Sequence, residues 1–145
     1  PGMRLGVPVK GRCAALIIMN KLILTLLPDK LGICRLESGV SLQKLPRDDG
    51  VFFSVTKTAE ETSLVCSEEL IPADIPSEKN FRIFKVEGPL EFGLTGILAM
   101  LLEPLAKAGI PVFTLSTYDT DYIMIKEEKL EKAVKALNTV SQVIC

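Results

Sequence analysis

The alternation of apolar and polar positions is clearest in the second half of the chain, where it predicts two helices. In the first, apolar residues recur at i, i+3, i+4, i+7, i+8 and i+11, the spacing of one helical face: Leu94, Ile97, Leu98, Leu101, Leu102 and Leu105. Gly109 predicts the end of this helix, and Pro104 predicts a kink or a shortened last turn. The second helix is predicted over 127–137, with an acidic first turn and one apolar face: Leu130, Ala133, Val134 and Leu137.

Short aliphatic or β-branched runs between turn residues predict the strands. They cover 22–27, 31–37, 51–56, 63–67, 81–87, 111–117, 121–126 and 140–144. In the second half the order is therefore strand, helix, strand, strand, helix, strand (βαββαβ). This is the order of the ferredoxin-like α+β fold, an antiparallel sheet with two helices on one face.

A faint internal repeat predicts two tandem units of this kind. The segment FSVTKTAEETSLVCSEEL, residues 53–70, aligns without a gap with FTLSTYDTDYIMIKEEKL, residues 113–130, at a spacing of 60 residues. Such a repeat indicates two copies of one supersecondary unit. The first copy is degenerate, because Gly39 and a proline-containing stretch stand where its helices would lie. We therefore expect a first, degenerate unit over 20–70, a linker over 71–80 and a second unit over 81–145.

Residues 1–19 are expected to be a leader outside the fold. Basic residues followed by the apolar run 14–19 imitate a secretory signal, and the other interpretation is a non-native extension before a start at Met19. We favour the extension, because Asn20 and Lys21 end the run and no small-residue cleavage site follows. The run is far shorter than the roughly 20 apolar residues of a transmembrane helix, so we expect no membrane association.

Composition narrows the classes of function. The chain has no histidine and no CxxC pair among its four cysteines, which argues against a catalytic triad, a zinc site and an enzyme in general. The net charge is −1 without a basic stripe, so no nucleic-acid partner is expected. Scattered single cysteines favour a reducing, cytoplasmic location. No cofactor or metal is indicated, since Asp119 and Asp121 lack a third ligand.

The predicted topology brings one candidate site together. A right-handed crossover makes strands 81–87 and 111–117 parallel, so the loop 88–93 and the turn 117–121 lie at the same sheet edge. The first helix begins there, and its free N–H groups suit an anion, while Asp119 and Asp121 suit a cation. Thr95, Thr117 and Thr120 can orient a ligand by hydrogen bonds. Together they suit a zwitterion such as a free amino acid. The other interpretation is ordinary turn chemistry without a ligand.

These segments resemble a known family. VEGPLEFGLTGILA, residues 86–99, followed by AGIPVFTLSTYDTDYIMIKEEKL, residues 108–130, resembles the ACT domain. In particular it resembles the small bacterial proteins with two tandem ACT domains, which are similar to the ACT modules of the animal cytosolic arginine sensor. The resemblance implies ligand contacts from the start of the first helix and from the TY/F-x-x-D turn: Thr95, Gly96, Ile97, Thr117, Tyr118 and Asp121. In the first half, Lys57, Thr58 and Glu61 are expected to replace Thr117, Tyr118 and Asp121.

The function that the resemblance implies is regulatory. ACT domains bind small ligands, typically amino acids, at domain interfaces and commonly pair side by side. We therefore expect a non-catalytic regulatory module that binds a free amino acid, forms a homodimer and acts on a regulated protein partner. The alternative is an ACT-fold protein–protein interaction module without a ligand.

Overall fold

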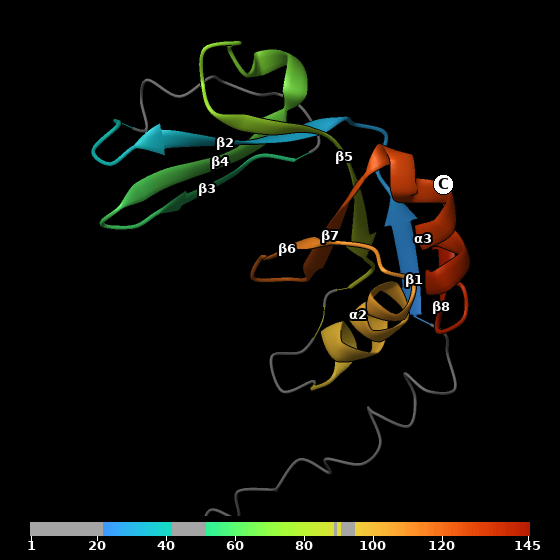
Figure 1. Ribbon diagram of the computed structural model, residues 1–145. Helices are drawn as coiled ribbons and strands as arrows, with labels where there is room; N and C mark the ends of the chain where they lie inside the picture. Colours follow the sequence, from blue (N-terminus) through green and yellow to red (C-terminus); the bar gives the residue numbers. More distant parts are fainter. Residues whose placement is uncertain (1–21, 42–51, 89, 91–94) are drawn as a thin grey trace, which may run out of the picture.

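The computed structural model describes residues 22–41, 52–88, 90 and 95–145 (Figure 1). The predicted leader, 1–19, lies outside the described residues, as do Val51 and Leu94. The described part contains eight strands: β1 (Leu22–Leu26), β2 (Leu31–Glu37), β3 (Ser54–Lys57), β4 (Glu61–Ser67), β5 (Ser77–Val86), β6 (Phe113–Ser116), β7 (Asp121–Lys126) and β8 (Ser141–Ile144). Its helical elements are α2 (Ile97–Lys107), α3 (Leu130–Leu137) and the short 3₁₀ helices η2 (Glu68–Leu70) and η3 (Glu127–Lys129).

The long strand β5 joins two parts of one sheet. Phe81 pairs with Leu31 of β2 and with Lys126 of β7. Phe84 pairs with β1 and with β7. Since a strand has only two edges, β7 lies along one edge of β5, and β2 and β1 follow one another along the other. Figure 1 shows the β2–β4 part and the β6–β8 part diverging from β5.

Both parts of the sheet follow the ferredoxin-like strand order. Around the first half of β5 the order is β3-β4-β2-β5. Around its second half, β6 and β7 lie on one side of β5, and β1 and β8 lie on the other. β1 runs antiparallel to β5 and parallel to β8, so a strand from the start of the chain separates two strands of the C-terminal part. The predicted α+β, ferredoxin-like fold is confirmed, and this inserted strand is an addition to it.

Helices α2 and α3 bury their apolar faces against the C-terminal part of the sheet. Leu101, Leu105 and Leu137 are fully buried there beside Leu24 and Phe84 of the strands. Each fully buried leucine or phenylalanine contributes about 1.5–3 kcal/mol relative to an exposed one, so this cluster carries much of the stability.

The predicted end of the first helix is confirmed. Gly109 has a φ of 68°, and the N–H groups of Gly109 and Ile110 donate to the carbonyls of Ala106 and Leu105, which is a Schellman motif. The helix runs past Pro104 to Lys107, so the last turn is not shortened.

The strand predictions differ from the structure mainly at β5. The strands predicted over 31–37 and 121–126 are confirmed residue for residue. The strand predicted to begin at Phe81 begins at Ser77, so the last residues of the predicted linker, 71–80, belong to β5. The side chains of Ser77 and Glu78 are exposed, which explains why their polar sequence looks like a linker. The division of the chain into two units at this linker stays a prediction.

The internal repeat is present at a spacing of 59 residues, so the predicted spacing of 60 is wrong by one. β3 begins at Ser54 and β6 at Phe113, while η2 begins at Glu68 and η3 at Glu127, 59 residues later in both cases. The buried triplets 64–66 and 123–125 agree with the same spacing. Identical phenylalanine and glutamate residues favoured the alignment at a spacing of 60 residues, whereas the pairing of the strands fixes the register at 59.

Candidate functional site

The turn between β6 and β7 is built by its own threonines. The N–H of Thr117 donates to the carbonyl of Thr120 at 2.8 Å, and the Thr117 hydroxyl lies 3.2 Å from the same oxygen. The N–H of Thr120 donates to the Thr117 hydroxyl at 3.3 Å. The Thr120 side chain is almost completely buried, and its hydroxyl donates to the carbonyl of Val86 at 2.5 Å. Both hydroxyls therefore hold the turn and fasten it to the end of β5.

The loop after β5 lies against this turn, as predicted from the right-handed crossover. The N–H of Leu90 donates to the carbonyl of Asp119 at 2.7 Å. A Cβ atom added at Gly88 would lie 2.8 Å from the nitrogen of Leu90 and 3.2 Å from the oxygen of Asp119, so the close approach requires glycine. The predicted adjacency of the two segments is confirmed for Gly88 and Leu90, while 89 and 91–94 lie outside the described residues.

The start of α2 is the third component of the site. Gly96 is the N-cap residue, with a left-handed φ of 82°, and it has no side chain that could cap the first turn. Its carbonyl accepts the first helical hydrogen bond, from the N–H of Met100 at 2.9 Å. The N–H groups at the start of an α-helix have no partner within the helix, and they carry the positive end of its dipole. This end of α2 is therefore suited to an anionic group.

These components enclose a pocket of about 330 Å³. Its lining contains five of the six residues predicted from the resemblance: Gly96, Ile97, Thr117, Tyr118 and Asp121. Thr95 is exposed and does not line it. Asp119 and Thr120, which the topology argument had indicated, also line the pocket.

Sequence reasoning missed three lining residues, Leu90, Leu98 and Ser116. Ser116 pairs with Asp121 across the β6–β7 hairpin, so the predicted strands already contained the signal for it. Its hydroxyl donates to Oδ1 of Asp121 at 2.5 Å, which holds that carboxylate at the pocket. Leu90 and Leu98 add apolar surface.

The pocket thus combines unlike charges with an apolar wall. The start of α2 lies on one side, and the carboxylates of Asp119 and Asp121 belong to the turn. Tyr118, which lines the pocket, is 82% exposed, and an aromatic face there can attract a cation. Among the described residues, no cluster of three or more Cys, Asp or Glu side chains is suited to hold a metal ion. No helix in the described part of the chain is long and apolar enough to cross a membrane.

Comparisons with known proteins agree with the ferredoxin-like fold. The ACT-domain family model matches residues 76–139, and a second family model, for an N-terminal domain, matches residues 29–74. Residues 76–139 of this chain therefore belong to the ACT-domain family.

Two relatives illustrate the range of the similarity. The chain is 32% identical over 110 residues to the cytosolic arginine sensor for mTORC1 subunit 1 of Bos taurus, an alignment that covers 68% of this chain and 33% of the sensor. The chain thus spans about one third of the length of that curated relative. It is 33% identical to an Agobacterium tumefaciens protein of known crystal structure, with a TM-score of 0.78 over 86% of this chain and 92% of that one.

A more distant structure shares the fold alone. The aspartate kinase of Clostridium acetobutylicum, described as an allosteric enzyme, superposes with a TM-score of 0.60 at 13% identity, over 83% of this chain and 33% of the kinase. The ACT-domain match and the arginine-sensor relative, not the kinase structure, relate the chain to regulatory modules of amino-acid sensing.

Proposed function

We propose that this chain is a non-catalytic regulatory module that binds a free amino acid in the pocket between the start of α2 and the β6–β7 turn. The observation that carries the proposal is the placement of the helix start and the two turn carboxylates around one pocket. The ligand's carboxylate would accept hydrogen bonds from the first N–H groups of α2. Its ammonium group would face Asp121.

The charge balance favours an amino acid with a cationic side chain. Two acidic residues, Asp119 and Asp121, line the pocket, and an amino acid with a neutral side chain has only one ammonium group to meet them. The exposed ring of Tyr118 supports the same choice, because cations are attracted to aromatic faces. The Bos taurus relative is named as an arginine sensor, which agrees with this chemistry. L-arginine and L-lysine are therefore the first ligands to test.

The proposal includes a cytoplasmic location and a homodimer that acts on a protein partner. The cytosolic relative supports the location. β6 and β8 each pair on one side only among the described strands, and such open edges favour association. Light scattering over a wide concentration range checks the dimer, and a monomer throughout contradicts this part of the proposal.

A thermal-shift screen of the twenty amino acids tests the ligand. A ligand that binds only the folded chain stabilises it by about 2.7 kcal/mol at one hundred times its Kd. For a chain of this size that is a rise in Tm of roughly 5–10 °C. Asp121→Asn keeps the shape of the side chain and removes its charge, so it should weaken binding about 10- to 100-fold. Glu69→Gln, an exposed change on η2 outside the pocket, is the matched control.

A second candidate function is an interaction module without a ligand. One observation favours it: the hydroxyls of Thr117, Thr120 and Ser116 already form hydrogen bonds within the chain, so they need no ligand as a partner. The screen separates the two candidates. If no amino acid raises the Tm, or if Asp121→Asn binds as tightly as the unaltered chain, the ligand site is wrong and the interaction module is preferred.

A further inference from the structure

The β3–β4 turn of the first part of the chain has the same construction as the turn at the pocket. The N–H of Thr58 donates to the carbonyl of Glu61 at 2.9 Å, as that of Thr117 does to Thr120. The N–H of Glu61 donates to the Thr58 hydroxyl at 3.1 Å, again as in the second turn. Thr58 and Thr117 are 59 residues apart, the same spacing as the neighbouring strands. The two turns are therefore structural counterparts.

This equivalence identifies the counterpart of Asp121. Asp121 stands opposite Ser116 across the β6–β7 hairpin, and Thr62 stands opposite Lys57 across the β3–β4 hairpin. The counterpart of Asp121 is therefore Thr62, not Glu61 as the gap-free sequence alignment had predicted. The carboxylate that would face a ligand's ammonium group is replaced by a hydroxyl.

Thr62 also closes this position to solvent. Its side chain is fully buried, and its hydroxyl oxygen has no hydrogen-bond partner among the residues that the structure describes. Residues two and four positions further along β4, Leu64 and Cys66, lie on the same face of the strand and belong to a buried apolar cluster with Ile71. Asp121, in contrast, is only partly buried and lines a pocket. A charged ligand group at Thr62 would have to lose its hydration without gaining a counter-charge.

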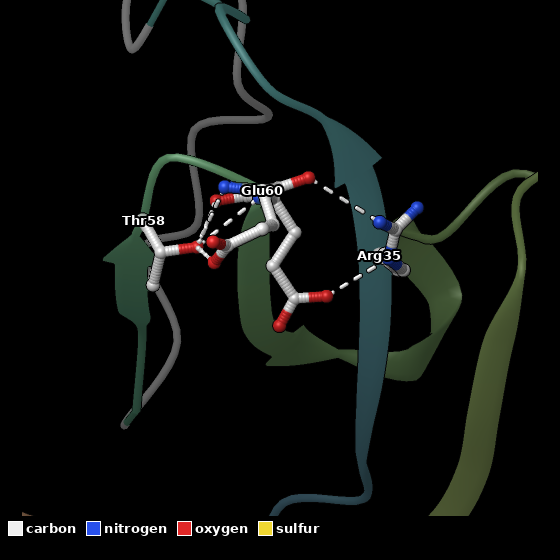
Figure 2. Close-up of polar contacts among 4 residues, drawn as sticks. Arg35, Thr58 and Glu60 are labelled. Atoms are coloured by element: carbon white, nitrogen blue, oxygen red, sulfur yellow. Dashed lines mark hydrogen bonds and ion pairs between the residues drawn. The ribbon is translucent and has the colours of Figure 1, made fainter.

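The carboxylate of Glu61, in the first turn, is already paired with a cation of the chain itself. Arg35 of β2 donates through Nε to the carboxylate of Glu61 at 2.8 Å and through a terminal nitrogen to the carbonyl of Glu60 at 3.3 Å. Figure 2 shows this guanidinium reaching the turn beside Thr58 and Glu60. An external cation would have to displace an internal one.

We propose that each chain carries one amino-acid site, at the second turn, and that the first turn is a closed counterpart in which Thr62 replaces the ligand-binding carboxylate and Arg35 neutralises Glu61. This inference rests on the proposed function. It assigns ligand recognition to the second part of the chain and leaves the first part a structural partner.

Isothermal titration of the whole chain with L-arginine, and with the amino acid that gives the largest thermal shift, tests the inference. We expect one ligand per chain. Asp121→Asn should weaken all of the binding about tenfold or more. Tyr118→Ala reaches the same pocket through an exposed side chain and should also weaken it, so a folding defect in the first variant does not decide the result. Arg35→Gln and Glu61→Gln should leave both stoichiometry and affinity unchanged.

Two ligands per chain would overturn the inference while leaving the proposed function intact. The same holds if Arg35→Gln removes binding. If one full-affinity site persists in both pocket variants, the site named in the proposed function is wrong, and this inference is overturned with it. If no amino acid binds the unaltered chain, the proposed function fails, and this inference fails with it. The two failures are therefore distinguishable.

Discussion

We expect the hydrogen bond from the buried hydroxyl of Thr120 to be the main interaction that holds the β6–β7 turn against the sheet. β5 bonds to β1 through alternate residues, since Ile83 accepts from Leu27 and Glu87 donates to Ile23. The carbonyl of Val86 therefore faces the β7 side, where Thr120 supplies its partner at 2.5 Å. Thr120→Val keeps the shape of the side chain and leaves this buried carbonyl without that donor.

The expected cost of Thr120→Val is about 1–3 kcal/mol, the usual penalty for a buried polar group that loses its partner. For a chain of this size the Tm should fall by roughly 3–9 °C. Thr120→Ser is the matched control, because it retains the hydroxyl and removes only a methyl group. Calorimetry of both variants measures the effect. A Thr120→Val chain that melts with the unaltered protein, or a Thr120→Ser chain that melts as low as Thr120→Val, would refute this reasoning.

Three further changes have defined outcomes. Gly96→Ala should lower stability by about 1–2 kcal/mol in denaturant titrations, because φ is 82°. Apart from its neighbours in the chain, no atom of the described residues lies within 4 Å of an added Cβ, so only backbone strain is introduced, and Gly96→Asn should cost less. The pKa of Glu127 lies below its ordinary value because Lys30 donates a hydrogen bond to its carboxylate at 2.7 Å. The ionised carboxylate therefore stabilises the fold above the pKa that Glu127 has in the unfolded chain, and this stabilisation is lost on acidification below about pH 4.3. Lys30→Met should therefore flatten the dependence of Tm on pH in this acid range, and an unchanged slope contradicts the assignment. A chain that begins at Met19 should unfold cooperatively, since it retains β1 and every later strand, whereas a chain that begins at Phe81 loses β1 and the first part of β5 and should not; circular dichroism melting curves compare them.

The sequence predicted most of what is local in this fold. The apolar spacing of α2 and the β-rich run of β7 depend on neighbouring residues, and both were placed correctly. The insertion of β1 between β5 and β8 was not predictable in this way, because it depends on pairing between distant parts of the chain. The start of β5 was hidden because Ser77 and Glu78 are exposed strand residues with polar side chains.

The candidate site, like the fold, could be predicted only in part. The right-handedness of the crossover was sufficient to predict that Gly88 lies beside the β6–β7 turn, because that rule does not depend on the sequence. The roles of Thr117 and Thr120 were not resolved, since hydroxyls suit a ligand and a turn equally well. A one-residue error in the repeat then assigned Glu61, rather than Thr62, to the place of Asp121.

The position of β1 has a consequence for the biosynthesis of this protein. Leu22 pairs with Ser141, so the first described strand emerges from the ribosome long before one of its two neighbours exists. Until β8 is synthesised, one edge of β1 has no strand to pair with, although β5 can already cover the other. Unpaired strand edges in partly made chains are prone to associate with other chains. The sheet should therefore close late during translation, and a ribosome that stalls before Ser141 would leave a nascent chain with this edge exposed.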